Sequence, residues 1–285
     1  MNILVTGSDG QLGMEMQKIA SQFPQFRFIF TDVAQLDITD KTALERFITE
    51  HRPDVVMNFA AYTAVDKAET EQEIAVAVNA VAVEDLTELS NQHNFFLLHI
   101  STDYVLDGKN LLPIDEEQDM APQSFYGFSK ALGEAAMWAH CRRGVILRTS
   151  WLYSSFGNNF VKTILKHAAE KEELKVVNDQ TGTPTYAADL AYFILSHLEK
   201  MLQTAGVETY HFSNSDVATW YDFACAIVEL ANLPCKIQPI STAEYPTAAP
   251  RPAYSVMSKQ KIKDEFNCTP RHWKEALVDC LSGML

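Results

Sequence analysis

Short apolar runs alternate with longer amphipathic stretches from Met1 to Ser150. The apolar runs are rich in β-branched and aromatic residues, which predicts strands at 3–6, 26–30, 53–58, 95–102 and 145–148. Between these runs, apolar residues recur with a helical period at 11–23, 40–51, 72–93 and 126–141. Strands that alternate with helices at this spacing predict an α/β fold with a doubly wound parallel sheet.

The pattern becomes looser after Trp151. We predict helices at 158–171, 187–202 and 219–232 and from Trp273, short strands at 175–177 and 209–212, and an irregular proline-rich crossing at 239–252. Residues 1–150 are therefore expected to form an N-terminal domain. Residues 151–285 are expected to form mainly a smaller C-terminal substrate-binding lobe, with segments that return to the sheet.

The turn between the first predicted strand and the first predicted helix is rich in glycine. Gly7, Gly10 and Gly13 form a Gly-x-x-Gly-x-x-Gly pattern, with Gln11 and Leu12 between the last two. Glycines at these places permit a tight turn, let the backbone approach a pyrophosphate and allow close helix packing, while the helix N-terminus faces the anion. The pattern and its position predict a dinucleotide-binding domain of the Rossmann type.

An acidic residue, Asp32, follows the second predicted strand. A carboxylate at this place accepts hydrogen bonds from the adenosine ribose hydroxyls and repels a 2′-phosphate, so it favours NADH over NADPH. The alternative is a turn or capping residue without a cofactor contact.

A second group of polar residues follows the fourth predicted strand. Tyr126 and Lys130 are four residues apart, on one face of a helix, and Thr102 ends the strand. A phenol beside an ammonium is a general-acid arrangement, and we expect the positive charge to lower the pKa of Tyr126. His99, inside the apolar strand, is interpreted as a core histidine rather than a catalyst.

Composition and charge argue against several classes of partner. The 285-residue chain is 47% hydrophobic and has a formal net charge of −14, which disfavours binding to nucleic acid or to an anionic membrane. The five cysteines form no Cys-x-x-Cys pair, no apolar run reaches the roughly 20 residues of a bilayer span, and no signal peptide precedes the first strand. We expect a cytoplasmic protein with a small-molecule substrate.

Together these motifs resemble the extended short-chain dehydrogenase/reductases. Further stretches narrow the resemblance to the dTDP-4-dehydrorhamnose reductases: 60–69, 101–105, 148–153, 157–160, 178–185 and Arg251-Pro252. The similarity runs from Asn2 to about Met257. It implies NAD(P)H-dependent reduction of the 4-keto group of the nucleotide sugar dTDP-4-dehydro-β-L-rhamnose to dTDP-β-L-rhamnose.

The resemblance also implies roles for single residues. Tyr126 would protonate the developing alkoxide, Lys130 would hold the nicotinamide ribose, and Thr102 would hydrogen-bond the ketone oxygen. The implied cofactor contacts are Gly10, Gln11, Leu12, Asp32, Asp37, Ile38, Ala61, Tyr62 and Thr63, and the implied substrate contacts are Thr102, Asp103 and Trp151. Arg251 suits a nucleotide diphosphate, with a surface salt bridge as the alternative.

The chain departs from the pattern of some family members at a metal site. Those members form a dimer around Mg²⁺ held by glutamates. Glu15 matches one ligand, but Ala188 stands where they carry a glutamate, with Asp189 one place further on. We therefore expect no metal and a monomer or a weak homodimer.

The sequence leaves alternatives open for the identity of the cofactor and for the activity. Family members use NADH, NADPH or either, and Asp32 favours NADH here. Two other functions remain open: a nucleotide-sugar epimerase or dehydratase that retains its NAD⁺, and a non-catalytic regulatory protein like the β subunit of methionine adenosyltransferase.

Overall fold

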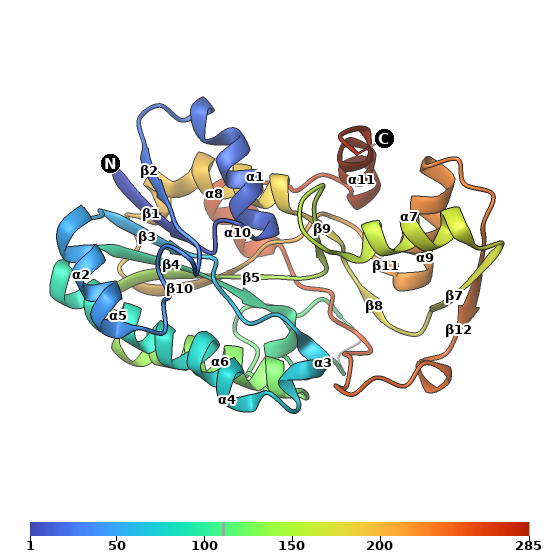
Figure 1. Ribbon diagram of the computed structural model, residues 1–285, viewed down its shortest axis with the longest axis horizontal. Helices are drawn as coiled ribbons and strands as arrows, with labels where there is room; N and C mark the ends of the chain where they lie inside the picture. Colours follow the sequence, from blue (N-terminus) through green and yellow to red (C-terminus); the bar gives the residue numbers. More distant parts are fainter. Residues whose placement is uncertain (110–111, 285) are drawn as a thin grey trace.

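Six parallel strands form the central sheet of the computed structural model, which describes residues 1–109 and 112–284 (Figure 1). Along the sheet the order is β10-β5-β4-β3-β1-β2, and every neighbouring pair is parallel. The strands are β1 (Asn2–Thr6), β2 (Arg27–Phe30), β3 (Val55–Asn58), β4 (Phe96–Thr102), β5 (Arg143–Thr149) and β10 (Gly206–His211). The chain winds outward in both directions from β1, so the carboxyl ends of β1 and β3 border the crevice where such sheets bind ligands.

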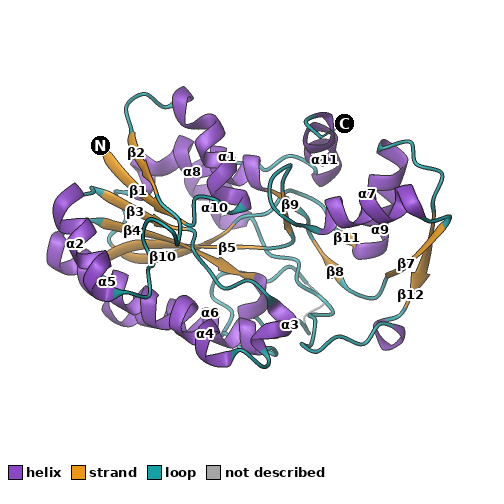
Figure 2. Ribbon diagram, viewed as in Figure 1, coloured by secondary structure: helices purple, strands orange, loops and turns teal. Residues whose placement is uncertain are grey.

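Helices cover both faces of this sheet (Figure 2). One face carries α1 (Gln11–Ile19), α8 (Ala187–Met201) and α10 (Gln260–Phe266), and the other carries α2 (Lys41–His51), α5 (Ala82–His93) and α6 (Phe125–His140). With both faces covered, the inner strands are continuous apolar runs, and Ile3, Leu4 and Val5 are all fully buried. The predicted doubly wound α/β fold is confirmed.

Local side-chain caps set where two of these helices begin. The Asp40 carboxylate accepts from Ala43 N at 3.0 Å at the start of α2. The Ser124 hydroxyl accepts from Gly127 N at 3.1 Å at the start of α6. This second cap places Tyr126 in the first turn of α6 and Lys130 one turn further along the same face.

The predicted helix at 72–93 is interrupted. It consists of α4 (Gln72–Val76), a π-helical turn η2 (Ala77–Val81) and α5, with the short helix α3 (Val65–Ala68) before it. In the π turn, Asn79 is buried and its side chain accepts from Tyr62 N at 2.9 Å and donates to the Ser129 hydroxyl at 3.0 Å. The prediction of one regular helix is wrong at residues 77–81, because no glycine or proline there marks the extra residue of a π turn.

A second lobe forms after β5 and has its own apolar core. Its elements are β6 (Leu152–Tyr153), α7 (Phe160–Glu170), β7 (Glu173–Val177), β8 (Thr181–Gly182), β9 (Thr185–Tyr186), β11 (Ala218–Thr219), α9 (Trp220–Leu230), β12 (Lys236–Ile240) and α11 (Trp273–Ser282). Between them, α8, β10 and α10 return to the central sheet. Strand β12 begins before the proline-rich crossing and contains Pro239, which a two-stranded sheet tolerates because its outer edge needs no backbone donor. No helix in the described part of the chain is long and apolar enough to span a membrane.

A substitution at Gly133 tests how closely α6 packs on the π turn. A Cβ at Gly133 overlaps the Asn79 carbonyl oxygen and lies 3.4 Å from Val83 Cγ2. We expect Gly133→Ala to lower the free energy of unfolding by about 1–3 kcal/mol from overpacking, despite the better helix propensity of alanine. Thermal and urea unfolding measure this effect. Ala135→Ser, which adds one heavy atom on the exposed face of α6, is the control, and equal stability of both variants would contradict the packing argument.

Candidate active site

The glycine turn leaves backbone groups accessible at the start of α1. Gly7 has φ +65°, and a Cβ there lies 2.5 Å from Ala60 N, so only glycine fits. A Cβ at Gly13 lies 2.5 Å from both Ser8 Cα and Ser8 O, so Gly13 lets α1 pack against the turn. Gly10 occupies the N-cap position without a side chain to cover the first amides of the helix. This arrangement fits a pyrophosphate at the helix N-terminus.

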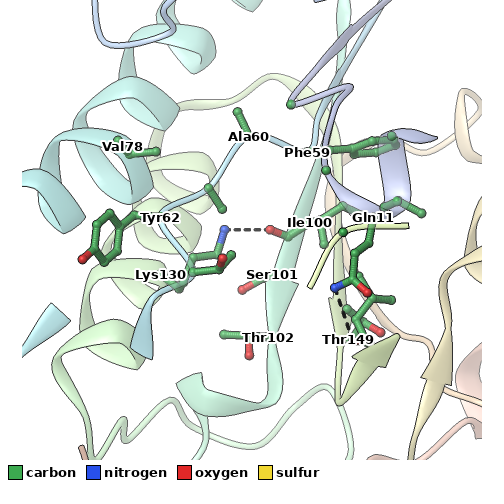
Figure 3. A pocket seen from close by; sticks show the side chains of 18 of the residues that line it. Gln11, Phe59, Ala60, Tyr62, Val78, Ile100, Ser101, Thr102, Lys130 and Thr149 are labelled. Carbon is green, nitrogen blue, oxygen red and sulfur yellow. Dashed lines mark hydrogen bonds between the residues drawn. The ribbon is translucent and has the colours of Figure 1, made fainter. Parts of the chain in front are cut away.

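The carboxyl ends of β1, β3, β4 and β5 border a cavity of about 920 Å³ (Figure 3). Every site residue proposed from the sequence lines it except Arg251: Gly7, Gly10, Gln11, Leu12, Gly13, Asp32, Asp37, Ile38, Ala61, Tyr62, Thr63, Thr102, Asp103, Tyr126, Lys130 and Trp151. The glycine turn and the Tyr126 group, far apart in sequence, therefore share one cavity. Its size suits a dinucleotide together with part of a second ligand.

Acidic groups surround the part of the cavity beside β2. Asp32 Oδ2 accepts from Asp9 N at 2.9 Å, and its Oδ1 accepts from Val33 N at 2.8 Å. Each carboxylate oxygen keeps a further acceptor direction, so this turn role is compatible with a contact to ribose hydroxyls. Asp9 and Asp37 also line the cavity, and Lys130 is the only lysine or arginine among its described lining residues.

The Tyr126 phenol is buried beside Thr102 and Asp103. Thr102 Oγ1 donates to Asp103 Oδ1 at 3.0 Å, and the Tyr126 ring meets the Tyr104 ring edge-on at 5.5 Å. Burial raises the pKa of Tyr126 to about 12, while the Thr102 side chain opposes that rise and the Asp103 charge adds to it. The expectation that Lys130 lowers the pKa of Tyr126 is therefore wrong for the protein alone, because burial dominates. The Tyr126 phenol is therefore protonated at neutral pH.

Lys130 is fully buried, and its ammonium site is made by strand β4. Its Nζ donates to Ile100 O at 2.7 Å and lies 3.0 Å from His99 Nε2 (Figure 3 shows the bond to Ile100). Burial lowers the pKa of Lys130 to about 7, and the charge of Glu134, one turn along α6, opposes that shift. His99 is a buried histidine, as expected from its strand, but its Nε2 also contacts Lys130, the only lysine or arginine in the described lining of the cavity.

Trp151 forms a rigid flat wall of the cavity. It has φ +47°, which is a strained conformation for a bulky residue, and its ring stacks on Trp220 with 3.6 Å between centroids and 9° between planes. A Cβ at Gly182 lies 2.6 Å from the Trp151 indole, so glycine makes room for the ring. The surrounding contacts thus hold an unfavourable backbone conformation in place.

Several residues of the site have no motif in the sequence. Asn58 bonds to His99, Asn79 ties the Tyr62 backbone to Ser129, and Trp220 supports Trp151. Asn79 is a polar residue within a helix of apolar periodicity, and this position could have indicated a buried hydrogen-bonding role. Asn58 ends an apolar strand, where site residues of parallel sheets gather. Nothing in the sequence indicates that Trp220 reaches Trp151.

Arg251 lies outside the lining of the cavity. Its guanidinium pairs with Asp66 at 2.7 Å, and Asp66 also accepts from Ala249 N at 3.1 Å. In the protein alone, Arg251 therefore ties the proline-rich crossing to α3, which is the salt-bridge alternative for this residue.

The residues at and beside the positions of the family's metal site form hydrogen bonds and an ion pair with other side chains. Glu15 is fully buried and its Oε1 accepts from Ser154 Oγ at 2.6 Å, while Asp189 pairs with Arg271 at 2.7 Å and accepts from Asn214. No group of three His, Cys, Asp or Glu side chains within 1–109 and 112–284 is arranged to hold a metal ion.

Comparison with known proteins shows a full-length family match. The family described as RmlD substrate binding domain matches residues 1–285. A dTDP-4-dehydrorhamnose reductase of Aggregatibacter actinomycetemcomitans is 40% identical over 284 residues, covering 96% of each chain.

Two solved structures share the whole fold. A dTDP-4-dehydrorhamnose reductase of Clostridium acetobutylicum superposes with a TM-score of 0.95 at 39% identity, covering 100% of this chain and 99% of the other. A dTDP-4-dehydrorhamnose reductase of Bacillus anthracis, solved in complex with NADP, superposes with a TM-score of 0.94 at 35% identity, covering 99% of each chain. The chain therefore belongs to the RmlD substrate binding domain family, the family of these dTDP-4-dehydrorhamnose reductases.

Proposed function

We propose that this protein reduces the 4-keto group of dTDP-4-dehydro-β-L-rhamnose with NADH or NADPH, forming dTDP-β-L-rhamnose. The observation that carries the proposal is a protonated, buried Tyr126 that shares one cavity with a glycine turn suited to a dinucleotide. The names of the relatives support the sugar and its nucleotide, and the NADP complex of one relative supports a nicotinamide cofactor.

Tyr126 is the proton donor in this reaction. A bound nicotinamide would supply the hydride, and its addition to C4 of the sugar would leave an alkoxide oxygen that needs a proton. The Tyr126 O–H bond breaks as its proton passes to that oxygen, which leaves a phenolate. Thr102 lies beside the phenol, and its single O–H, which donates to Asp103 Oδ1 in the protein alone, would turn to the sugar oxygen.

Lys130 supports this proton transfer by its charge. As an ammonium it would stabilise the Tyr126 phenolate, and it is a residue that would hold the ribose hydroxyls of the cofactor. The ammonium is already desolvated and held by Ile100 O, so it does not need to reorganise when the phenolate forms. Trp151, fixed by Trp220, offers an apolar face to the sugar.

The charges around Asp32 favour NADH as the reductant. A 2′-phosphate beside Asp32 also meets Asp9 and Asp37, and the cavity lining offers no described arginine or second lysine to neutralise it. A relative that binds NADP shows that the family fold itself accepts the larger cofactor.

The first prediction concerns Tyr126→Phe. We expect kcat to fall by about 10²–10⁴-fold, while NADH binding measured by fluorescence is retained because only the proton donor is removed. The assay follows loss of reduced-nicotinamide absorbance with enzymatically generated dTDP-4-dehydrorhamnose, and product is identified by chromatography. Wild-type turnover in this variant would exclude Tyr126 as the donor.

The same assay separates the other functions. An epimerase or dehydratase converts sugar nucleotide without net consumption of reduced cofactor, and a regulatory protein converts none. Either result with the wild-type protein rejects the reductase proposal.

The second prediction concerns Asp32→Asn. We expect wild-type kcat/KM to be at least about tenfold higher with NADH than with NADPH, and the variant to reduce that ratio by about tenfold, or ~1.4 kcal/mol. The change should fall mainly on the KM for NADPH because the removed charge opposes binding of the 2′-phosphate. Glu50→Gln, which removes an equal charge on α2 outside the cavity lining, is the control. A wild-type preference for NADPH would refute the selection argument.

The third prediction is an alkaline limb in the pH profile. Burial lowers the pKa of Lys130 to about 7, so its ammonium is present below that pH and is lost as the pH rises through it. Because kcat/KM for the cofactor reports the free enzyme, we expect it to fall by up to about tenfold per pH unit above pH ~7. Lys259, whose pKa burial lowers to about 8 outside the cavity, provides the control variant Lys259→Met. If the alkaline limb moves in Lys259→Met, the titrating group is Lys259, and the prediction for Lys130 is contradicted.

A further inference from the structure

A buried chain of hydrogen-bonding groups runs beneath the cavity to Lys130. Thr6 Oγ1 donates to Asn58 Oδ1 at 2.7 Å, Asn58 Nδ2 lies 3.1 Å from His99 Nδ1, and His99 Nε2 lies 3.0 Å from Lys130 Nζ. These residues come from β1, β3, β4 and α6, and each is at most 1% exposed. Solvent therefore cannot replace any partner in the chain.

The direction of the Thr6–Asn58 hydrogen bond determines whether His99 Nε2 presents a proton or a lone pair to Lys130. Because Asn58 Oδ1 accepts from Thr6, the Asn58 amide nitrogen faces His99 and donates to its Nδ1. Burial and the charge of Lys130 hold the pKa of His99 well below its ordinary value, so the imidazole is neutral and carries its proton on Nε2. An Nε2–H group facing Lys130 Nζ requires a lone pair there, and only the neutral amine has one.

The protonated form of Lys130 requires the opposite direction. An ammonium has three N–H groups and no lone pair, so it needs a bare His99 Nε2. His99 then carries its proton on Nδ1 and donates to Asn58 Oδ1, after a half rotation of the carboxamide, and Asn58 Nδ2 donates to Thr6 Oγ1. A hydroxyl, a carboxamide and a neutral imidazole all donate as well as accept, so every bond in the chain is kept in both directions.

We propose that His99 and Asn58 are positioning residues that hold Lys130 in both of its protonation states, with the tautomer of His99 changing in step with the charge of Lys130. When Lys130 gains a proton, the His99 proton resides on Nδ1, and when Lys130 loses it, the His99 proton resides on Nε2. The net change is one proton on Lys130, exchanged with solvent, and His99 stays neutral throughout. The catalytic consequence of this coupling depends on the proposed reductase function, but the tautomer change itself does not.

Other ionisable groups surround the chain without providing the same coupling. The groups on packed elements are Tyr126 and Glu134 on α6, Arg148 on β5, His211 on β10 and Asp103 after β4. Arg148 is bound by Glu134 through bonds of 2.7–3.1 Å, so the two side chains are each other's partners and not partners of His99. Tyr126 and Asp103 line the cavity together with Lys130, and neither side chain hydrogen-bonds to His99 in the described residues.

A second buried histidine serves as an internal control. His211 Nδ1 lies 3.2 Å from Ile114 O, and its Nε2 lies 3.4 Å from Arg148 Nη1. A carbonyl only accepts and a guanidinium only donates, so His211 is fixed as the Nδ1–H tautomer. Burial lowers the pKa of His211 to about 3, which keeps it neutral as well.

Nitrogen NMR of ¹⁵N-histidine-labelled protein tests the proposal directly. Long-range ¹H–¹⁵N spectra distinguish a bare ring nitrogen from an N–H nitrogen, and His99 is assigned with His99→Gln. Between pH 6 and 9 we expect the two His99 nitrogens to exchange these signatures, with one midpoint, while His211 does not change. The midpoint should coincide with that of Lys130, followed through ¹³Cε-labelled lysine and assigned with Lys130→Arg. A constant His99 tautomer, an imidazolium signal or unequal midpoints would overturn the proposal.

A locking variant gives an independent test in the same enzyme. Asn58→Asp places an acceptor-only carboxylate beside Nδ1, which fixes the Nδ1–H tautomer and a bare Nε2. We expect the Lys130 midpoint to rise by about 1 pH unit or more, and the alkaline limb of kcat/KM to move by the same amount. Thr6→Ser, which keeps the hydroxyl, should leave both unchanged. If Asn58 has only a structural role, Asn58→Asp lowers kcat/KM equally at every pH and the alkaline limb does not move. That result would reject the positioning role.

Failure of the tautomer proposal and failure of the reductase proposal give different experimental results. A tautomer change in a protein that reduces no sugar nucleotide rejects the reductase proposal and retains the coupling. Full reductase activity with a fixed His99 tautomer rejects the coupling alone.

Discussion

Complete burial of the Lys130 ammonium site is the constraint on which the cavity depends. A buried amine needs hydrogen-bonding partners fixed in advance, and Ile100 O and His99 Nε2 provide them from the middle of β4. For Lys130 to reach them, α6 must lie close to the neighbouring backbone. Gly127 and Gly133 permit this, because side chains there would overlap the carbonyl oxygens of Tyr104 and Asn79. The close approach that serves Lys130 also brings Tyr126 into the cavity beside Thr102, so one packing requirement places both groups.

The second lobe contacts the helix that follows the glycine turn, and it also contributes Trp151 to the cavity lining. Asn159 donates to Gln11 Oε1 at 2.9 Å, and Ser154 donates to the buried Glu15, both on α1. Helix α1 therefore contacts the glycine turn at one end and the second lobe along its side. Such contacts between the lobes hold the glycine turn and Trp151 in a fixed relation, which would favour the proposed reaction because it needs two ligands aligned.

Much of this arrangement could be predicted from local signals. The glycine turn, Asp32, Thr102 and the Tyr126–Lys130 pair stand at strand ends or on one helix face, and strand ends of a parallel sheet meet at one edge. What could not be predicted depends on partners distant in sequence. No glycine or proline marks the π turn at Asn79, the stacking of Trp220 on Trp151 needs the lobe to fold, and His99 has the apolar neighbours of an ordinary core residue. The pKa of Tyr126 was misjudged for a related reason: sequence spacing shows a nearby lysine but not how deeply the phenol is buried.

Burial shifts the pKa of Tyr126 upward and that of Lys130 downward, so both groups tend toward their neutral forms in the protein alone. A neutral phenol suits a proton donor, but a neutral amine does not stabilise the phenolate that remains after transfer. Lys130 regains charge most readily when negative charge arrives nearby, and a dinucleotide pyrophosphate at the start of α1 brings such charge into the same cavity. The ammonium then lowers the pKa of Tyr126 and makes the phenol a better donor. By this argument, binding of an anionic ligand shifts Lys130 from the mixture of amine and ammonium set by its pKa of about 7 toward the ammonium that the proposed proton transfer requires.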